Sequence, residues 1–198
     1  MANLKTVRIW LWVAVVALAL TAGTAFLLLR NAPGTQAGFG GGQYALLDGN
    51  NQPVNQTVFN GHPSMLFFGF THCPDVCPTT MAEMASWFEQ LGDAGKPLRG
   101  YFVSVDPERD TPAVLGDYVG AVSDRITGLT GKPEEVAKII KAWHIYAQKV
   151  PGENGDYSMD HTATVFLLNS KGEFEGTIAY QEDSRTALEK LRNLLAKT

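Results

Sequence analysis

An uncharged apolar stretch near the N-terminus constrains this chain most strongly. Between Ile9 and Leu29 the sequence contains no charged residue, and Trp10 and Trp12 lie near its start. At a rise of about 1.5 Å per residue, a helix of this length crosses a hydrocarbon core about 30 Å thick. Indole rings also favour the membrane interface. The sequence therefore predicts a transmembrane anchor over residues 9–29.

The distribution of basic residues predicts the orientation of this anchor. Lys5, Arg8 and the amino terminus precede it, whereas only Arg30 follows before the next basic residue, Lys96. Because positive charge is retained on the cytoplasmic side, residues 1–8 are predicted to be cytoplasmic. We expect a single-pass protein of the inner (cytoplasmic) membrane with its C-terminal domain on the periplasmic side.

The same stretch also fits a cleaved signal peptide. Gly23, Thr24 and Ala25 are small enough for a cleavage site, but the apolar run continues from Phe26 to Leu29. This continuation favours an uncleaved anchor. Both interpretations place the domain in an oxidising compartment, where cysteines that work as thiols need an upstream reductant.

Composition divides the rest of the chain into a linker and one domain. Residues 30–42 are rich in Gly and Pro and are predicted to be a flexible linker, so that the folded domain spans residues 43–198. The chain is 45% hydrophobic and 18% charged, with a net charge of −4, which suits a globular domain with a proper core. Its basic residues are scattered, so nucleic-acid binding is not expected.

Hydrophobic periodicity predicts strands that alternate with helices. The run SMLFFGF at residues 64–70 is continuously apolar, as in a strand buried on both faces. Further strands are predicted at residues 44–47, 99–106, 126–130, 145–150, 161–168 and 173–180, a polar loop at 151–160, and helices from Thr79 or Thr80 to Leu91, after Thr111, from Pro133, and from Asp183 or Ser184. This order predicts an α/β fold with a central mixed β-sheet flanked by helices.

Both cysteines, Cys73 and Cys77, lie in the loop that follows the strand at residues 64–70. Four positions apart on a helix or tight loop, they face the same side and can hold a disulfide, a metal or a redox couple. A structural disulfide is disfavoured, because closing so short a loop constrains the unfolded chain by only roughly 2 kcal/mol, against about 4.7 for a hundred-residue loop.

Two thiolates and one imidazole would form a soft donor set, one ligand short of a closed zinc site. His161 begins a predicted strand after a long loop and can reach a neighbouring strand end, with Asp160 beside it to orient the ring. The remaining histidines are weaker candidates: His62 is expected on the surface, His144 in a structural role, and His72 pointing away from Cys73. Met81 and Met84 are spaced as core residues of a helix, although methionine can also bind copper.

A charged loop, Asp106 to Pro112, follows the second buried strand. Thr111 can cap a helix whose first turn contains Pro112, so a turn with a helix cap is the simpler interpretation. The alternative is a rim that docks a partner.

Three motifs together resemble the Sco/SenC family: CPDVCPTT from Cys73, DPERDTP from Asp106, and Asp160-His161 before a strand. The resemblance covers roughly Gln43 to Leu195 and agrees with an N-terminal anchor. It implies a thioredoxin-like fold and a copper chaperone, not an enzyme, with Cys73, Cys77 and His161 as the copper ligands. It also implies delivery to the binuclear copper centre of cytochrome c oxidase subunit II, with an upstream copper donor and a thiol reductant as further partners. Asp75 also matches an acidic position of the family.

Two other functions use the same cysteines. A membrane-tethered thiol-disulfide oxidoreductase could reduce the cysteines of the copper acceptor, although the spacing here has three intervening residues where thioredoxins have two. A thiol peroxidase or redox sensor would use Cys73 and Cys77 in turn, with Arg109 as a nearby candidate for peroxide binding. Copper, in either Cu(I) or Cu(II) form, remains the cofactor that the donor set favours.

Overall fold

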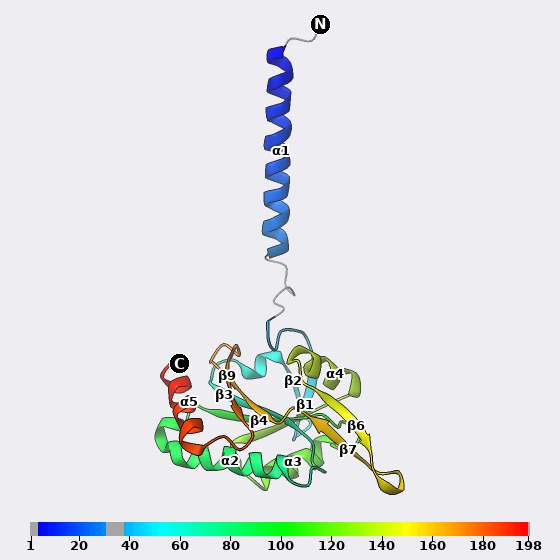
Figure 1. Ribbon diagram of the computed structural model, residues 1–198, viewed down its shortest axis with the longest axis vertical. Coiled ribbons are helices and arrows are strands. Elements are labelled where there is room, and N and C mark those ends of the chain that lie inside the picture. The colour runs from blue at the N-terminus through cyan, green and yellow to red at the C-terminus, as the bar shows by residue number, and fades with distance from the viewer. Residues whose placement is uncertain (1–3, 31–37, 198) are drawn as a thin grey trace. The chain divides into compact units, whose positions relative to one another are not determined.

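The structure is a computed structural model that describes residues 4–30 and 38–197 (Figure 1). Helix α1 (Leu4–Arg30) belongs to one compact unit, and the residues from Gly38 onward form a second. Residues 31–37 of the predicted linker and residues 1–3 of the predicted cytoplasmic segment lie outside the described residues.

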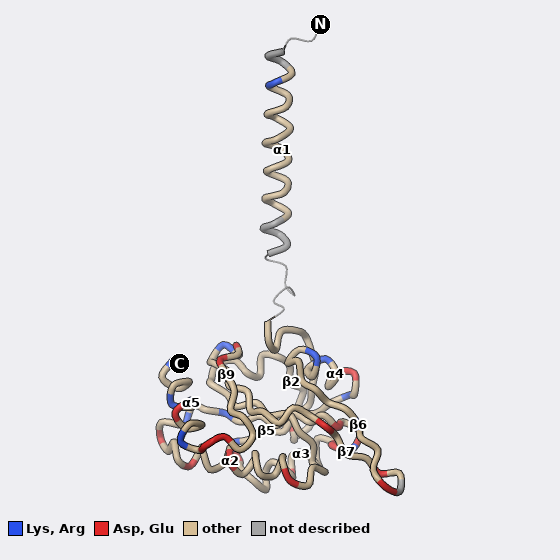
Figure 2. The backbone as a smooth tube through the Cα atoms, in the orientation of Figure 1, with Lys and Arg blue, Asp and Glu red and all other residues tan. Residues whose placement is uncertain are grey.

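Helix α1 contains the predicted apolar segment. Its candidate span, Val7–Ala25, has a mean hydropathy of 1.8 and no buried residue, and by length and composition it can cross a membrane. Figure 2 shows its described middle part without acidic residues. The structure confirms the predicted helix.

The second unit is built on a seven-stranded sheet, within residues 38–197, in the order β2-β1-β5-β4-β3-β8-β9. Strands β3, β4 and β5 are parallel, and the remaining pairings are antiparallel, which confirms the predicted mixed sheet. The strands are β1 (Ala45–Asp48), β2 (Pro53–Asn55), β3 (Ser64–Gly69), β4 (Arg99–Ser104), β5 (Ile126–Thr130), β8 (Thr164–Leu168) and β9 (Phe174–Ala179).

Helices flank this sheet on both faces (Figure 1). They are α2 (Val76–Leu91), α3 (Pro112–Gly120), α4 (Pro133–Ala142) and α5 (Ser184–Ala196). Alternate residues of β4 mark the two faces, because Phe102 packs against Tyr118 of α3 and Tyr101 packs against Phe59, which in turn contacts Trp143 after α4. The carboxyl ends of the parallel strands β3, β4 and β5 lie at the same edge of the sheet. Open α/β sheets bind their ligands at this edge.

The core is continuous across both faces. All six residues of β3 are buried, as its unbroken apolar sequence predicts. Met81 and Met84 of α2 are completely buried, which confirms them as core residues.

Helix α2 begins earlier than predicted. It starts at Val76, with Asp75 at the cap position, instead of at Thr79 or Thr80. Pro78 is compatible with this start, because proline is tolerated in the first turn of a helix, where its missing N–H is not needed. The earlier start places Cys77 inside the first helical turn.

The polar segment after α4 also differs from the prediction. Strands β6 (Ala147–Pro151) and β7 (Tyr157–His161) pair antiparallel as a separate two-stranded ribbon, so the predicted loop at residues 151–160 is wrong for its second half. His161 consequently ends β7 and does not begin the next strand, which starts at Thr164. The ribbon lies outside the main sheet, and most of its residues are exposed, so β7 lacks the apolar pattern of a buried strand, whereas β6 overlaps the strand predicted at residues 145–150.

The compact unit extends a few residues upstream of the predicted boundary at Gln43. The Gly40 N–H donates a hydrogen bond of 2.9 Å to the Ala142 carbonyl, and the Phe39 ring stacks on Phe174 with centroids 4.9 Å apart. Gly40 has a φ of 78° and lies so close to the Trp143 ring that a Cβ would clash with it. The end of the glycine-rich segment is therefore packed against the domain.

Candidate metal centre

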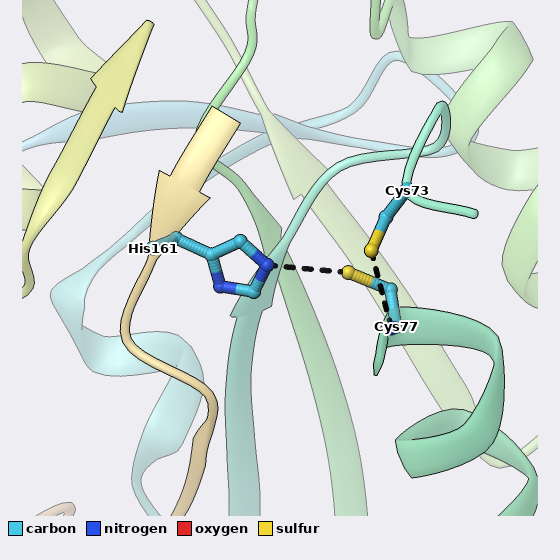
Figure 3. Close-up of side chains that lie close together, drawn as sticks. All are labelled: Cys73, Cys77 and His161. Atoms are coloured by element: carbon cyan, nitrogen blue, oxygen red, sulfur yellow. Dashed lines mark hydrogen bonds between the residues drawn. The ribbon is translucent and has the colours of Figure 1, made fainter. Parts of the chain in front are cut away.

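Three side chains from different elements meet at the sheet edge (Figure 3). Cys73 lies in the loop after β3, Cys77 in the first turn of α2, and His161 at the end of β7. The potential ligand atoms, two sulfurs and one imidazole nitrogen, all lie within 4.8 Å of one another. The fold therefore brings together the three residues singled out from the sequence.

Cys77 is the innermost of the three. Its side chain is fully buried, and its backbone N–H donates to the Cys73 sulfur at 3.4 Å. Burial raises the pKa of the Cys77 thiol, and its contact with Cys73 raises it further, against a backbone hydrogen bond with Phe70 that lowers it. Cys77 is therefore a neutral thiol in the metal-free protein, and both cysteines are free.

The His161 ring presents one nitrogen to the sulfurs. Its Nε2 lies 3.4 Å from Cys77 Sγ, and its Nδ1 lies 3.1 Å from the Thr162 carbonyl oxygen. Because a carbonyl can only accept, Nδ1 carries the proton and the lone pair of Nε2 faces the sulfurs, which is the tautomer that a metal requires. Burial lowers the pKa of His161, so the ring is neutral at pH 7.

The surroundings of His161 are aromatic. The rings of Phe67 and Phe70 meet the imidazole edge-on, with centroids 6.0 and 5.8 Å away. The Thr162 carbonyl takes the orienting role that the sequence assigned to Asp160, whose side chain is exposed at the end of the ribbon. Asp75 is likewise exposed and makes no side-chain cap hydrogen bond to α2.

The other three histidines lie elsewhere. His72 is exposed, with its Nδ1 3.1 Å from Thr71 Oγ1. His62 lies in a loop as predicted but is only partly solvated: the ring contacts Ser64 Oγ at 3.0 Å and Tyr101 Oη at 3.3 Å, and burial lowers its pKa. His144 is exposed and lies after the end of α4, with its ring 5.2 Å from that of Phe39.

Asp110 is a supporting residue that sequence reasoning missed. Its buried carboxylate accepts hydrogen bonds from the Thr71 N–H at 3.1 Å, Thr71 Oγ1 at 2.6 Å and Ser104 Oγ at 2.6 Å. It thereby joins the end of β4 to the start of the loop that carries Cys73. The signal available in the sequence was an acidic residue shortly after a buried strand.

The loop Asp106 to Pro112 is a turn with a helix cap, as the simpler prediction stated. Thr111 caps α3 by accepting from the Val114 N–H at 3.4 Å, with Pro112 at the first helical position. The side chain of Asp106 points inward, and that of Arg109 crosses to Tyr157 on β7. Arg109 is thus engaged in structural contacts at the position where the peroxidase alternative needed a peroxide-binding group.

Together, the mixed sheet, the dithiol at a helix start and the facing imidazole define a thioredoxin-like domain with a soft, three-atom donor site. The SCO1/SenC family model matches residues 32–196. This chain belongs to the SCO1/SenC family.

Relatives with known structures share the fold. ScoI of Bradyrhizobium japonicum, solved with copper bound, is 38% identical, with a TM-score of 0.71 over 77% of this chain and 98% of that one. Yeast Sco1, also solved with copper bound, is 29% identical, with a TM-score of 0.74 over 81% of this chain and 90% of that one. The mitochondrial SCO2 homolog of Mus musculus is 35% identical over 164 residues, which are 81% of this chain and 64% of the mouse protein. The chain spans 52% to 64% of the length of several such curated relatives.

Proposed function

We propose that this protein is a membrane-anchored copper chaperone that binds one copper ion through Cys73, Cys77 and His161. The convergence of two sulfurs and one correctly oriented imidazole nitrogen within 4.8 Å carries the proposal. Two similar proteins that were solved with copper bound support it.

The donor set suits copper in both oxidation states. Two thiolates and one imidazole satisfy Cu(I), which is soft, and Cu(II) binds the same trio with an added oxygen ligand. By the usual affinity order, copper also outcompetes zinc at such a site.

The partial burial of the ligands suits transfer of the copper ion to another protein rather than catalytic turnover of a substrate. Cys77 is fully buried, whereas Cys73 and His161 are half-exposed, so an incoming ligand reaches the metal from one side. An open coordination position lets that ligand bind before an outgoing one leaves. The protein therefore acts as a metallochaperone, not as an enzyme.

The acceptor in this proposal is the binuclear copper centre of cytochrome c oxidase subunit II, as the family resemblance implies. Helix α1 anchors the protein in the inner membrane, with the copper domain on the periplasmic side. An upstream copper donor supplies the site with copper. A thiol reductant keeps the two cysteines reduced, since thiols become oxidised in the periplasm.

A second candidate is reduction of a disulfide in the same acceptor. It is favoured by two free cysteines whose sulfurs lie together at a helix start, with Cys73 accessible for attack. Against this as the main activity, the two cysteines are separated by three residues, whereas the thioredoxin motif has two.

One experiment separates the two functions. The full-length protein in detergent, either copper-loaded or reduced and metal-free, is mixed anaerobically with the soluble domain of subunit II, whose cysteines are either reduced or joined in a disulfide. We expect copper to move from the loaded protein to the reduced acceptor, measured by the absorption of the binuclear centre. Disulfide reduction by the metal-free protein without any copper transfer would contradict the chaperone proposal and support the reductase.

A further inference from the structure

The ribbon that carries His161 is separate from the sheet that carries the dithiol. Strands β6 and β7 pair only with each other, whereas Cys73 and Cys77 follow β3 in the main sheet. His161 is joined to β8 of the main sheet by residues 162 and 163, so the distance from the imidazole to the sulfurs depends on this short link and on the contacts that fix the ribbon to the body of the domain.

Asp106, at the end of β4, provides one fixed point on the body. Its side chain is fully buried, and each carboxylate oxygen has a partner: Oδ1 accepts from the Tyr157 hydroxyl at 2.8 Å, and Oδ2 accepts from Arg109 Nε at 2.5 Å. The Asp106 N–H also donates to Ser104 Oγ at 3.0 Å. This bond ties the backbone of Asp106 to the end of β4.

Arg109 also contacts Tyr157, through the carbonyl oxygen and the aromatic ring of that residue. Its Nη1 donates to the Tyr157 carbonyl oxygen at 2.9 Å and to Asp156 Oδ1 at 3.2 Å. Its guanidinium lies 3.7 Å from the centroid of the Tyr157 ring, and Lys149 Nζ lies 4.4 Å from the same centroid. The hydroxyl, the ring and the carbonyl of Tyr157 are therefore all engaged by charged groups.

Tyr157 and His161 share one face of β7. Side chains two and four positions apart in a strand point the same way, and the burial along β7 follows this alternation, with Met159 between them buried. Fixing Tyr157 against the body therefore fixes the face from which His161 projects toward the sulfurs.

We propose that Asp106, Arg109 and Tyr157 form a hairpin latch that positions His161 over the dithiol. The latch does not touch the metal. It raises copper affinity by keeping the ribbon in the geometry that binds, since a site that is competent only part of the time binds proportionately more weakly. This inference rests on the proposed copper site.

The test is a mutant cycle on copper affinity in the reduced full-length protein, measured by Cu(I) competition. Tyr157→Phe keeps the aromatic ring and removes the hydroxyl that reaches Asp106. We expect about tenfold weaker binding, the lower end of the range for losing one hydrogen bond to a charged group. In a His161→Ala background, the same substitution is expected to cause no further loss of copper affinity, because the remaining ligands, Cys73 and Cys77, are not carried by the ribbon.

Tyr146→Phe is the matched control. Tyr146 precedes β6, is 56% exposed, and donates its hydroxyl to Gln148 Oε1 on the ribbon itself. This variant is expected to bind copper like the unaltered protein. Thermal unfolding of each metal-free variant shows whether it is folded.

Three results are decisive. Unchanged affinity in Tyr157→Phe overturns the latch, and so does an equal loss in the His161→Ala background, because the effect would then not pass through the histidine. Unchanged affinity in His161→Ala alone instead contradicts the three-ligand site itself. If Tyr157→Phe does not fold, Arg109→Lys replaces it, since Lys keeps the charge but loses the planar fork. The same dependence on His161 is expected.

Discussion

Gly69 lies directly against the sulfur of Cys77. A Cβ added to Gly69 would be 2.8 Å from Cys77 Sγ and 2.9 Å from two ring atoms of Phe102. The thiol of Cys77 occupies the space that a side chain at position 69 would need, so only glycine fits at the end of β3.

Gly69→Ala is accordingly expected to displace Cys77 and to weaken copper binding. Overpacking a core in this way costs about 1–3 kcal/mol of unfolding free energy, which urea denaturation of the metal-free protein can measure. Gly176→Ala is the matched control, because Gly176 also lies in a strand and has nothing within 4 Å of its added Cβ. Equal stability and copper affinity in both variants would show that the close approach is unimportant.

Copper affinity is expected to increase with pH. The raised pKa of Cys77 keeps this thiol protonated at neutral pH, so coordination must release its proton. Each proton released makes the apparent affinity about tenfold stronger per pH unit. His161 has a lowered pKa and is already neutral above pH ~6.5, so it adds proton competition only below that pH. Competition titrations between pH 6.5 and 8.5 test this, and an affinity independent of pH would mean that the thiols are already ionised.

Loss of the Asp110 carboxylate is expected to destabilise the domain and loosen the cysteine loop. Asp110→Ala leaves the Thr71 N–H and the hydroxyls of Thr71 and Ser104 without their partner. Hydrogen bonds to charged groups contribute about 1.5–3 kcal/mol each. We therefore expect the free energy of unfolding to fall by about 2 kcal/mol or more. Asp117→Ala, at an exposed position of α3, is the control and should change little. Equal stability of the two variants would contradict the supporting role of Asp110.

An uncleaved α1 predicts that the protein stays in the membrane fraction after alkaline extraction, with the mass of the full chain. Val16→Arg places a charge in the middle of the candidate span, at a cost of about 2.5–3.5 kcal/mol for insertion, and is expected to reduce the membrane-bound share. A mature mass that lacks the first 25 or so residues would instead establish a cleaved signal peptide.

Most of the main sheet could be predicted because its strands are strongly apolar. The run at residues 64–70 and the caps at Thr111 and Asp183 are local signals, and the structure confirms them. The proximity of His161 to the cysteines could also be predicted, because the family resemblance implied a shared site. The structure places His161 in contact with Cys77, which is 84 positions away in the sequence.

Only part of the ribbon could be predicted in the same way. The strand predicted at residues 145–150 overlaps β6, whereas β7 lies mostly in the predicted polar loop, and the pairing of the two strands has no local signal. The contact of Asp106 with Tyr157 joins residues 51 positions apart through polar groups. Burial of such groups is invisible in a sequence, and it follows only from where the fold places the end of β4.

The most direct test of the copper site is a titration of the fully reduced full-length protein under anaerobic conditions, with Cu(I) and Cu(II) in separate runs. We predict one tightly bound equivalent, thiolate-to-copper charge-transfer bands with Cu(II), loss of binding in Cys73→Ala and Cys77→Ala, and weakened binding in a folded His161→Ala variant. Weak binding, or oxidation of the thiols without retention of copper, would contradict the account.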